Sequence, residues 1–453
     1  RVIRAVQEKV GQRPVRTGLA NIRHLGALLR SGDYQVTVTV FQKEETVEIL
    51  SVEPGDRSTH HYAFVFDIGT TTITGQLVDL AGRWVLGTKV TYNRQATFGS
   101  DVITRIIYAQ EHEGLEKLHH AVVDVMNEMI EQFVAEHNVD LNDVTCVSVA
   151  GNTTMIHLLL KIDPTHIRQE PYVPTANAIP VVRAAEAGLK IQPHGLLFCV
   201  PGVASYVGGD ITAGIVACDM HRSKEVRLLI DIGTNGEIAL GHSEWMMSCA
   251  ASAGPAFEGS GMSCGLRAVR GAIQGMMIKD SSLELNLMTI GNDKPRGICG
   301  SGYIEAVAEL LCHRIVDKNG RIDRTLKNRR VRPSEQGYEF VLVFAQDSAT
   351  GNDIVITDAD LDNLKRAKAA IYSGIAVLLR HMNMRAEEVA KVYVAGGFGT
   401  SLSIESAVQI GLLPDIPRGS YAFVGNSSLA GARLNLFSVK SCLEAEATAA
   451  AVE

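Results

Sequence analysis

The alternation of apolar and polar positions in the first 62 residues differs from that in the rest of the chain. In TGLANIRHLGALLRSG (residues 17–32), apolar residues recur at helical spacing and the run stops at a glycine. Valines at positions 36, 38 and 40 then alternate with threonines, as in a half-buried strand. Residues 1–62 are therefore expected to form a small α+β module.

A second pattern, a short apolar strand followed by a glycine turn, occurs twice in the remaining residues. FVFDIG opens the first copy at Phe64, and helical runs lead from it to the strand VTCVSVAGN. VRLLIDIGTNGEIALG opens the second copy at Val226, and a long helical run leads to VAKVYVAGGFGTSL. Because the elements come twice in the same order, we predict a duplicated α/β fold over residues 63–453. Lobe I is expected at about 63–205 and lobe II at about 206–453, with a ligand-binding cleft between them.

Both copies place Asp-Ile-Gly-Thr at the end of their first strand. Glycine lets the backbone come close to a phosphate, whose oxygens can be bound by successive N–H groups and by the threonine hydroxyl. One such turn alone is more typical of a tight hairpin. Two copies favour a polyphosphate ligand, with one Mg²⁺ held through waters by Asp67 and Asp231. The predicted phosphate-binding residues are Gly69, Thr70, Thr71 and Thr72 in the first copy and Gly233, Thr234, Asn235 and Gly236 in the second.

Other glycine turns offer surfaces for the rest of a nucleotide. A flat ligand can lie against backbone that carries no side chains, so Gly396 and Gly397 are predicted to lie under adenosine. Gly300 and Ser301 begin an amphipathic helix whose first N–H groups can hold an anion or a polar edge. For the first VAG turn, at residues 151–152, ordinary strand-to-helix packing and a functional role fit equally well.

Composition and charge narrow the class of protein. The hydrophobic fraction is 46% and the charged fraction 21%, as in ordinary globular proteins. The formal net charge of −7 argues against nucleic acid as the main partner, and no apolar run is long enough to span a membrane. The eight cysteines are scattered without a Cys-x-x-Cys pair, which favours a reducing cytoplasm over a disulfide framework or a zinc site. A cytoplasmic protein is therefore expected.

The set DIGTTT, DIGTNGE and VYVAGGFG resembles the two phosphate motifs and the adenosine motif of the superfamily of sugar kinases, actin and chaperone ATPases. This resemblance implies a ribonuclease-H-like fold with two lobes around an ATP cleft, and Asp67 and Asp231 as catalytic acids. It also implies a catalytic or water-positioning acid in PGVASYVGGDITAGI, where Asp210 is the candidate, although a helix N-cap fits that position too. Glu237 could order a metal-bound water, but an exposed strand residue would look the same.

Three longer stretches, ASAGPAFEGSGMSCGLRA, GICGSGYIEA and VAGGFGTSL, together resemble the ATP-dependent reductive activators of corrinoid proteins, over essentially the whole chain. The resemblance implies that ATP binding and hydrolysis drive the return of a corrinoid cobalt from Co(II) to Co(I), with the electron coming from an N-terminal plant-type [2Fe–2S] domain. It further implies a corrinoid (cobalamin-binding) protein as partner, and a homodimer formed through the nucleotide-binding domain.

The chain departs from that family in one respect, because the C-x₄-C-x₂-C pattern of the cluster is missing. Since the first residue is Arg rather than Met, a cluster domain is expected to precede it. The chain is then expected to bind ATP and the partner without transferring electrons itself. Two alternatives stay open: a small-molecule kinase of the same superfamily, which would need an acceptor pocket, and a nucleotide-gated reactivation factor that barely hydrolyses ATP.

Overall fold

The computed structural model describes residues 1–453 except 12, 43–44, 260, 280–282, 336 and 398–401. The chain divides into two compact units. Unit 1 contains Arg1–Asp210 and Gly431–Glu446, and unit 2 contains Ile211–Ala430 and Ala447–Glu453. The chain therefore passes from one unit to the other three times, and neither unit is one continuous stretch.

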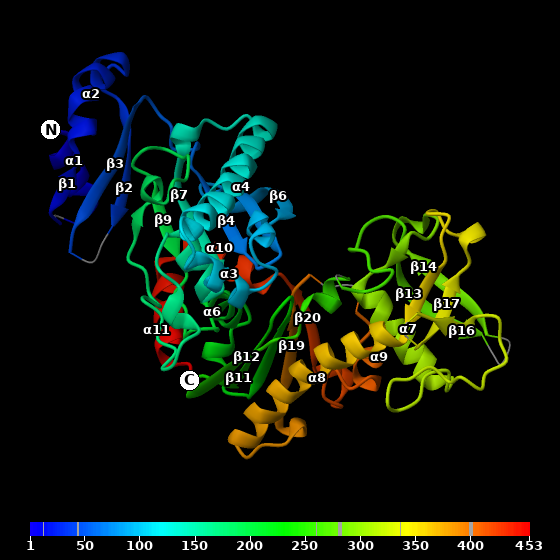
Figure 1. Cartoon of the computed structure of the whole chain (residues 1–453). Coiled ribbons are helices and arrows are strands. Elements are labelled where there is room, and N and C mark those ends of the chain that lie inside the picture. Colours follow the sequence, from blue (N-terminus) through cyan, green and yellow to red (C-terminus); the bar gives the residue numbers. More distant parts are fainter. Residues whose placement is uncertain (12, 43–44, 260, 280–282, 336, 398–401) are drawn as a thin grey trace. The chain divides into compact units, whose positions relative to one another are not determined.

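Unit 1 begins with a small module, drawn in blue in Figure 1. Its strands pair in the order β1-β3-β2, with β1 parallel and β2 antiparallel to β3. Both helices pack against this sheet around a small core that includes Val6, Val47, Ile49 and Val52. The α+β module expected from the valine alternation is confirmed. Its elements are α1 (Val2–Lys9), β1 (Val15–Thr17), α2 (Leu19–Ser31), β2 (Val36–Gln42) and β3 (Val47–Pro54).

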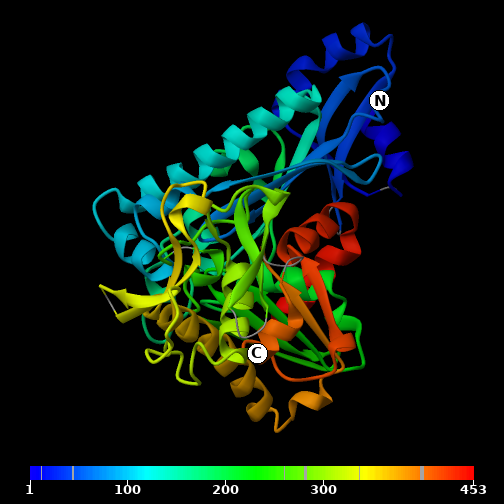
Figure 2. The same ribbon diagram turned by 90° about the vertical axis from the view of Figure 1, so that its right-hand side faces the viewer.

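The rest of unit 1 is built on a mixed sheet in the order β6-β5-β4-β7-β9-β8. Helix α4 covers this sheet (Figure 2), and its Phe133 ring lies 5.8 Å from that of Phe64 on β4. The strands are β4 (Tyr62–Ile68), β5 (Thr72–Asp79), β6 (Trp84–Tyr92), β7 (Val144–Gly151), β8 (Val182–Arg183) and β9 (Leu196–Cys199). The helices are α3 (Val102–Ala109), α4 (Gly114–His137) and α5 (Thr153–Leu159).

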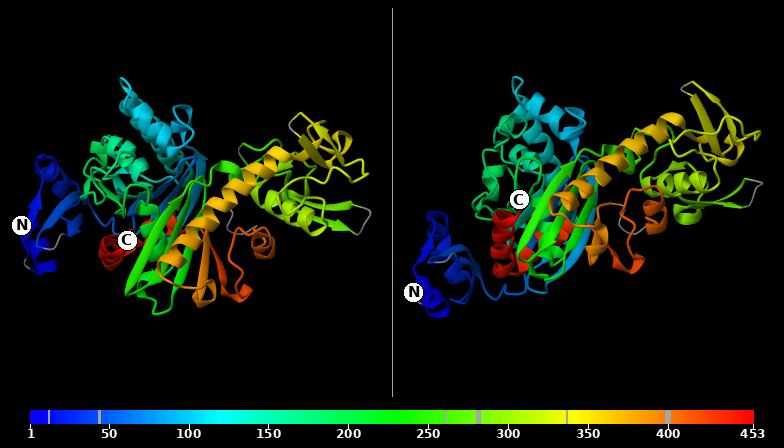
Figure 3. Two further views of the ribbon diagram at one scale, coloured as in Figure 1. Left: turned by 60° about the horizontal axis from the view of Figure 1, so that its bottom comes forward. Right: turned by 90° about the horizontal axis from the view of Figure 1, so that it is seen from below.

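Unit 2 repeats this topology with the sheet β12-β11-β10-β19-β20. Helix α8 (Asp358–His381) runs along it (Figure 3) and begins with a capping box between Thr357 and Asp360. In both sheets a hairpin precedes a parallel partner, and the register is the same: Asp67 lies opposite Ala150, and Asp231 opposite Ala395. The predicted duplication is therefore confirmed. The strands are β10 (Arg227–Ile232), β11 (Gly236–His242), β12 (Trp245–Ala251), β19 (Lys391–Ala395) and β20 (Tyr421–Gly425).

Between β12 and α8 the chain forms two further small sheets, for which the strand periodicity gave no prediction. They have the orders β14-β13-β15 and β16-β17-β18. Their elements are β13 (Ala272–Lys279), β14 (Glu284–Thr289), β15 (Gly297–Ile298), α7 (Gly300–Cys312), β16 (Val331–Ser334), β17 (Gly337–Val343) and β18 (Ile354–Thr357). β15, β16 and β18 have only two to four residues and Gly275 interrupts β13, so the sequence pattern of these strands is weak.

Three of the remaining helices contain the points where the chain changes unit: α6 (Gly209–Ala217), α10 (Ser427–Phe437) and α11 (Val439–Ala451). The fourth is α9 (Ile404–Gln409). Within unit 1, residues of α10 form hydrogen bonds with strands of the large sheet that lie much earlier in the sequence. Ser148 Oγ donates to the Ala432 carbonyl at 2.8 Å, and the Arg433 guanidinium donates to Gln76 Oε1 at 2.9 Å. Among the described residues, we find no helix with the length and apolar character that a membrane span requires.

Candidate functional site

The first Asp-Ile-Gly-Thr turn is a hairpin between β4 and β5. Ile68 and Ile73 form its last strand pair, so four residues make the turn. Gly69 N–H donates to the Thr72 carbonyl at 2.9 Å. A Cβ on Gly69 would lie 2.8 Å from that carbonyl oxygen, which explains why glycine stands there. Asp67 is partly exposed at the end of β4, where a carboxylate can reach a ligand.

A buried polar network holds the carbonyls of this turn. Asn93 Nδ2 donates to the Gly69 carbonyl at 2.9 Å, and Arg105 Nη2 donates to the Thr70 carbonyl at 2.5 Å. Gln95 Oε1 accepts from both Asn93 and Arg105, at 3.1 and 3.3 Å. Because the C=O and the following N–H of a trans peptide point in opposite directions, the N–H groups that follow these carbonyls face away from the network.

Sequence reasoning missed this network. Arg105 is fully buried, and burial lowers its pKa to about 10. The sequence did carry a signal for it, because Arg105 is the charged residue of the largely apolar helix VITRIIYA, next to the buried Ile106. Asn93 offered a second sequence signal, because asparagine is a preferred N-cap residue and here caps the short helix η1 (Arg94–Thr97).

The second turn is a hairpin between β10 and β11 and is one residue shorter than the first. Ile232 pairs with Gly236, and Gly233 N–H donates to the Asn235 carbonyl at 2.9 Å. Thr234 Oγ1 donates to Glu258 Oε1 at 2.8 Å, while Glu258 Oε2 is buried without a hydrogen-bond partner among the described residues. A carboxylate therefore lies beside this turn, and the sequence alone had not assigned it a role.

Glu237, the residue after this turn, is buried rather than exposed, with 8% of its surface accessible. It pairs with Asp231 across β10 and β11. The alternative of an exposed strand residue is therefore wrong. β11 is an inner strand of its sheet, between β10 and β12.

The second VAG turn lies directly against the second hairpin. Gly396 has φ +102°, and a Cβ there would lie 2.3 Å from the Ile232 carbonyl oxygen and 3.0 Å from Asp231 Oδ1. A Cβ on the exposed Gly397 would meet nothing within 4 Å, so this backbone is open to a flat ligand. Unit 2 thus brings Gly396 together with the residues 231–236. The continuation of VAGGFGTSL over 398–401 lies outside the described residues.

The first VAG turn packs against the loop that leads into α6. Asn152 Nδ2 donates to the Tyr206 carbonyl at 2.9 Å, and Thr153 Oγ1 donates to the Ala204 carbonyl at 2.6 Å. A Cβ on Gly208 would lie 2.4 Å from the Gly151 carbonyl oxygen. This turn therefore positions the loop before Asp210, which lies in the first turn of α6.

Gly300 and Ser301 form the first turn of α7, where both are buried. Ser301 Oγ lies 3.3 Å from Cys299 Sγ, which is also buried and lies 3.3 Å from the Ile273 carbonyl oxygen. These contacts are internal to the inserted sheets, and they do not bring the pair to the hairpin at 231–236. A nucleotide-binding role for Gly300 and Ser301 stays a prediction.

Within the described part of the chain, no three side chains of His, Cys, Asp or Glu come together as a metal-binding group. Mg²⁺ keeps most of its waters and takes only one or two protein carboxylates, so the partly exposed Asp67 and Asp231 still suit it. The buried, unpaired Glu258 Oε2 beside Thr234 is a further acceptor that a hydrated cation or its waters could use.

Three family models match the chain from end to end. The RACo linker region matches residues 1–59, the RACo middle region matches residues 62–223, and the C-terminal domain of RACo, the ASKHA domain, matches residues 225–453. The solved structure of a "Reductive activator for corrinoid,iron-sulfur protein" is 45% identical with a TM-score of 0.93, and the match covers 100% of this chain and 72% of that one.

Two curated relatives carry related names. The corrinoid activation enzyme RamQ of Eubacterium limosum is 34% identical over 386 residues, which are 83% of this chain and 64% of RamQ. The [Co(II) methylated amine-specific corrinoid protein] reductase of Methanosarcina barkeri is 26% identical over 404 residues, 82% of this chain and 69% of that protein. The chain thus spans about two thirds of the length of these relatives. By its three matching models and its duplicated actin-like fold, the chain belongs to the RACo family.

Proposed function

We propose that this chain is the nucleotide-binding part of an ATP-dependent reductive activator, which returns the cobalt of a corrinoid protein from Co(II) to Co(I). Membership of the RACo family, the 45% identical reductive activator and the names of both curated relatives support this function. The nucleotide-binding part of the proposal rests chiefly on one observation: two Asp-Ile-Gly-Thr hairpins occupy the same register against their VAG strands.

In the first hairpin, we assign phosphate binding to the backbone N–H groups of the turn Gly69–Thr72 and to its threonine hydroxyls. Asn93 and Arg105 hold the turn's carbonyls, so the N–H donors keep their direction before any ligand arrives. Donors fixed in advance need no reorganisation when charge develops on a phosphate oxygen. Asp67, at the end of β4, would hold Mg²⁺ through water.

In the second hairpin, Gly233, Thr234, Asn235 and Gly236 would bind phosphate in the same way, and Asp231 would hold Mg²⁺ through water. The open backbone at Gly397 and the adjacent Gly396 would lie under adenosine. Asp210 would orient the attacking water from the first turn of α6. Bound Mg-ATP would supply the free energy of its hydrolysis, which an activator of this kind would use to drive reduction of its partner's cobalt.

The residues of this chain do not fit an iron–sulfur cluster. The eight cysteines are far apart in sequence, and in the described structure all are free. Burial raises the pKa of Cys146, Cys199 and Cys218 to about 12, which disfavours the thiolate that iron requires. We therefore assign no electron-transfer step to these residues.

The variant Asp231→Ala tests the nucleotide site. It should abolish Mg-ATP hydrolysis and weaken Mg-ATP binding in calorimetry while leaving the circular dichroism spectrum intact. Asp293→Ala is the matched control in the same unit, because Asp293 pairs with Arg270 on the surface. Normal turnover by Asp231→Ala would contradict the assignment of this hairpin to ATP.

The partner is tested separately, with a cobalamin-binding protein in the Co(II) state. ATP-dependent association of the two proteins supports an activator, whereas transfer of labelled phosphate to a metabolite would identify a kinase. Binding of ATP and partner without measurable hydrolysis would identify a nucleotide-gated factor. Homodimer formation, checked by light scattering, and a cytoplasmic location stay predictions.

A further inference from the structure

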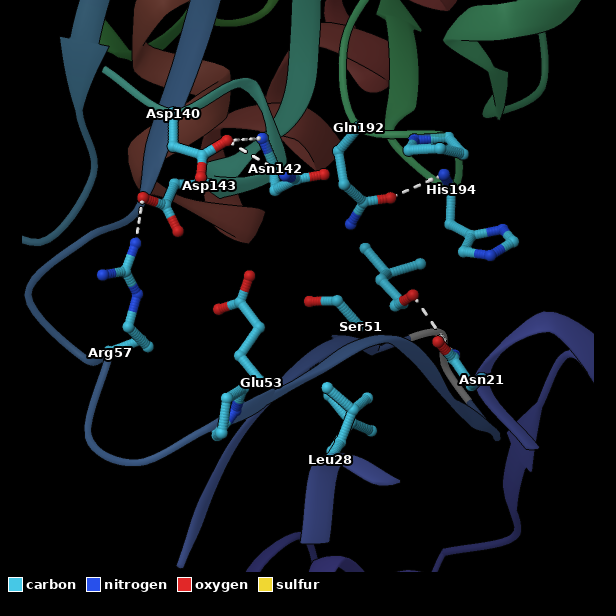
Figure 4. A pocket seen from close by; sticks show the side chains of 14 residues that line it. Asn21, Leu28, Ser51, Glu53, Arg57, Asp140, Asn142, Asp143, Gln192 and His194 are labelled. Carbon is cyan, nitrogen blue, oxygen red and sulfur yellow. Dashed lines mark hydrogen bonds and ion pairs between the residues drawn. The ribbon is translucent and has the colours of Figure 1, made fainter. Parts of the chain in front are cut away.

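Unit 1 contains a cavity of about 510 Å³ between its N-terminal module and its large sheet. Figure 4 shows that its walls come from three segments: the module with strand β3, the turn η2 (Leu141–Asp143) before β7, and the loop before β9. None of the residues assigned above to ATP lines it.

The charges around this cavity are predominantly negative. Among the described lining residues, Glu53, Asp140 and Asp143 carry carboxylates, and Arg57 carries a guanidinium. Arg57 is bound to Asp143 Oδ2 at 2.7 Å, and Asp140 Oδ1 accepts from the backbone of Asn142 at 2.9 Å. No hydrogen bond or ion pair joins the Glu53 carboxylate to the described residues, although the charges of Arg57 and His60 attract it, and in Figure 4 it points into the cavity. Burial, and then the negative charge of Asp143, raise the pKa of Glu53.

Two deeply buried side chains on the opposite wall have unused hydrogen-bonding atoms. Only 2% of the Asp143 side chain is exposed, and its Oδ1 has no partner among the described residues. Gln192 is 5% exposed; its Oε1 accepts from His194 N at 2.5 Å, whereas its Nε2 has no partner there. In Figure 4 the Asp143 side chain points toward Glu53, and the Gln192 amide points into the cavity toward Ser51.

An unpaired acceptor and an unpaired donor buried at one cavity are unfavourable unless a ligand satisfies them. The acceptors, Asp143 Oδ1 and the Glu53 carboxylate, require N–H donors and favour positive charge. The donor, Gln192 Nε2, requires an oxygen. A hydrated metal ion would satisfy the carboxylates but would compete with the nearby Arg57, and it would leave the amide without a fixed acceptor.

We propose that this cavity binds a small protonated primary amine that also carries a hydroxyl or carbonyl oxygen. The ammonium group donates to Glu53 and Asp143, and the oxygen accepts from Gln192 Nε2. Such a ligand joins Glu53 on the N-terminal module to two residues of the large sheet's loops. The proposal does not depend on the ATP site or on the corrinoid partner.

Ethanolamine is the probe, because at neutral pH it has one ammonium and one hydroxyl group. Equilibrium dialysis of the whole chain with labelled ethanolamine should show saturable binding at one site, together with a raised unfolding temperature. Tetramethylammonium, which has the charge but no N–H donor, and ethylene glycol, which has no charge, should bind at least 10-fold more weakly.

Glu53→Gln and Gln192→Leu should each weaken ethanolamine binding at least 10-fold. Glu53→Gln is the safer variant, because it removes a carboxylate that makes no hydrogen bond or ion pair with the described residues. Glu48→Gln is the matched control: Glu48 pairs with Arg183 at the same junction but does not line the cavity, so binding should be unchanged. Absence of saturable binding to the wild-type chain, or equal affinity for tetramethylammonium, would overturn the proposal, as would unchanged binding in both cavity variants.

Discussion

Replacing Arg105 by alanine is the sharpest test of how the first hairpin is held. Arg105 is fully buried and donates to the carbonyls of Gly99 and Thr70, at 2.9 and 2.5 Å. Burial lowers its pKa to about 10, and relative to the ordinary value of about 12.5 this drop corresponds to about 3 kcal/mol against the charged form. Removing the side chain recovers that energy.

The losses are larger than this recovery. The buried Thr70 carbonyl loses its donor at about 2–3 kcal/mol and the partly buried Gly99 carbonyl at about 1 kcal/mol, and the missing methylene groups with the cavity they leave cost about 2–3 kcal/mol. We therefore expect the unfolding free energy of unit 1 to fall by about 3 kcal/mol. The affinity for ATP should fall as well, since the Thr70 peptide is no longer held.

The assay uses the two tryptophans, of which Trp84 lies in unit 1 and Trp245 in unit 2. In a Trp245→Phe background, Trp84 fluorescence during urea denaturation reports unit 1 alone. The control is Arg94→Ala, because Arg94 is 54% exposed and pairs with Glu128 on the surface, so its loss should cost at most about 1 kcal/mol. If Arg105→Ala is no more destabilising than Arg94→Ala, the reasoning is refuted.

Three further predictions concern other residues described above. Gly396→Ala should destabilise unit 2 by about 2–4 kcal/mol, because φ is +102° and the new Cβ would clash with the Ile232 carbonyl. Urea denaturation followed by Trp245 fluorescence measures this loss. The control Gly397→Ala adds a Cβ in open space and should be nearly neutral, so equal effects of the two variants would contradict the prediction. Thr234→Val should lower the unfolding free energy of unit 2 by about 1–3 kcal/mol, because Glu258 Oε1 loses the hydrogen bond from the threonine hydroxyl. Thr234→Ser keeps the hydroxyl and should have wild-type stability. A valine variant as stable as the wild type would argue against the Thr234–Glu258 hydrogen bond. Glu53→Gln should stabilise unit 1 at pH 7, because the folded state raises the pKa of Glu53 and so disfavours its charged form. Urea titrations should show that this gain in stability shrinks as pH falls through the raised pKa and vanishes below the ordinary value of about 4.3. A gain that does not depend on pH would contradict the prediction.

The sequence was sufficient to predict the duplicated fold, because both copies carry the same local signals. Strand, glycine turn and VAG strand are short-range patterns, and the structure places Asp67 and Asp231 at equal register. The buried network of Asn93, Gln95 and Arg105 was missed, because its members meet only through tertiary packing. Their hydrophilic side chains look like surface residues until the chain folds over them.

The burial of Glu237 and the pairing of Thr234 with Glu258 were missed for the same reason. The residues 258 and 234 are 24 positions apart and lie on different elements, so no periodicity links them. The small sheets between β12 and α8 were missed for another reason. β14 does alternate, but β15, β16 and β18 have only two to four residues and Gly275 interrupts β13.

The return of the chain to unit 1 at α10 has a consequence for biosynthesis. Ser148 and Gln76 bind Ala432 and Arg433, residues made long after the sheet itself has left the ribosome. A nascent chain that has reached residue 430 therefore contains all the strands of the unit 1 sheets, but not the residues of α10 that form hydrogen bonds with them. Such late, long-range closure slows folding and prolongs the exposure of apolar surface. Unit 1, although most of it comes first in the sequence, can therefore finish folding only after residues 431–446 have been made.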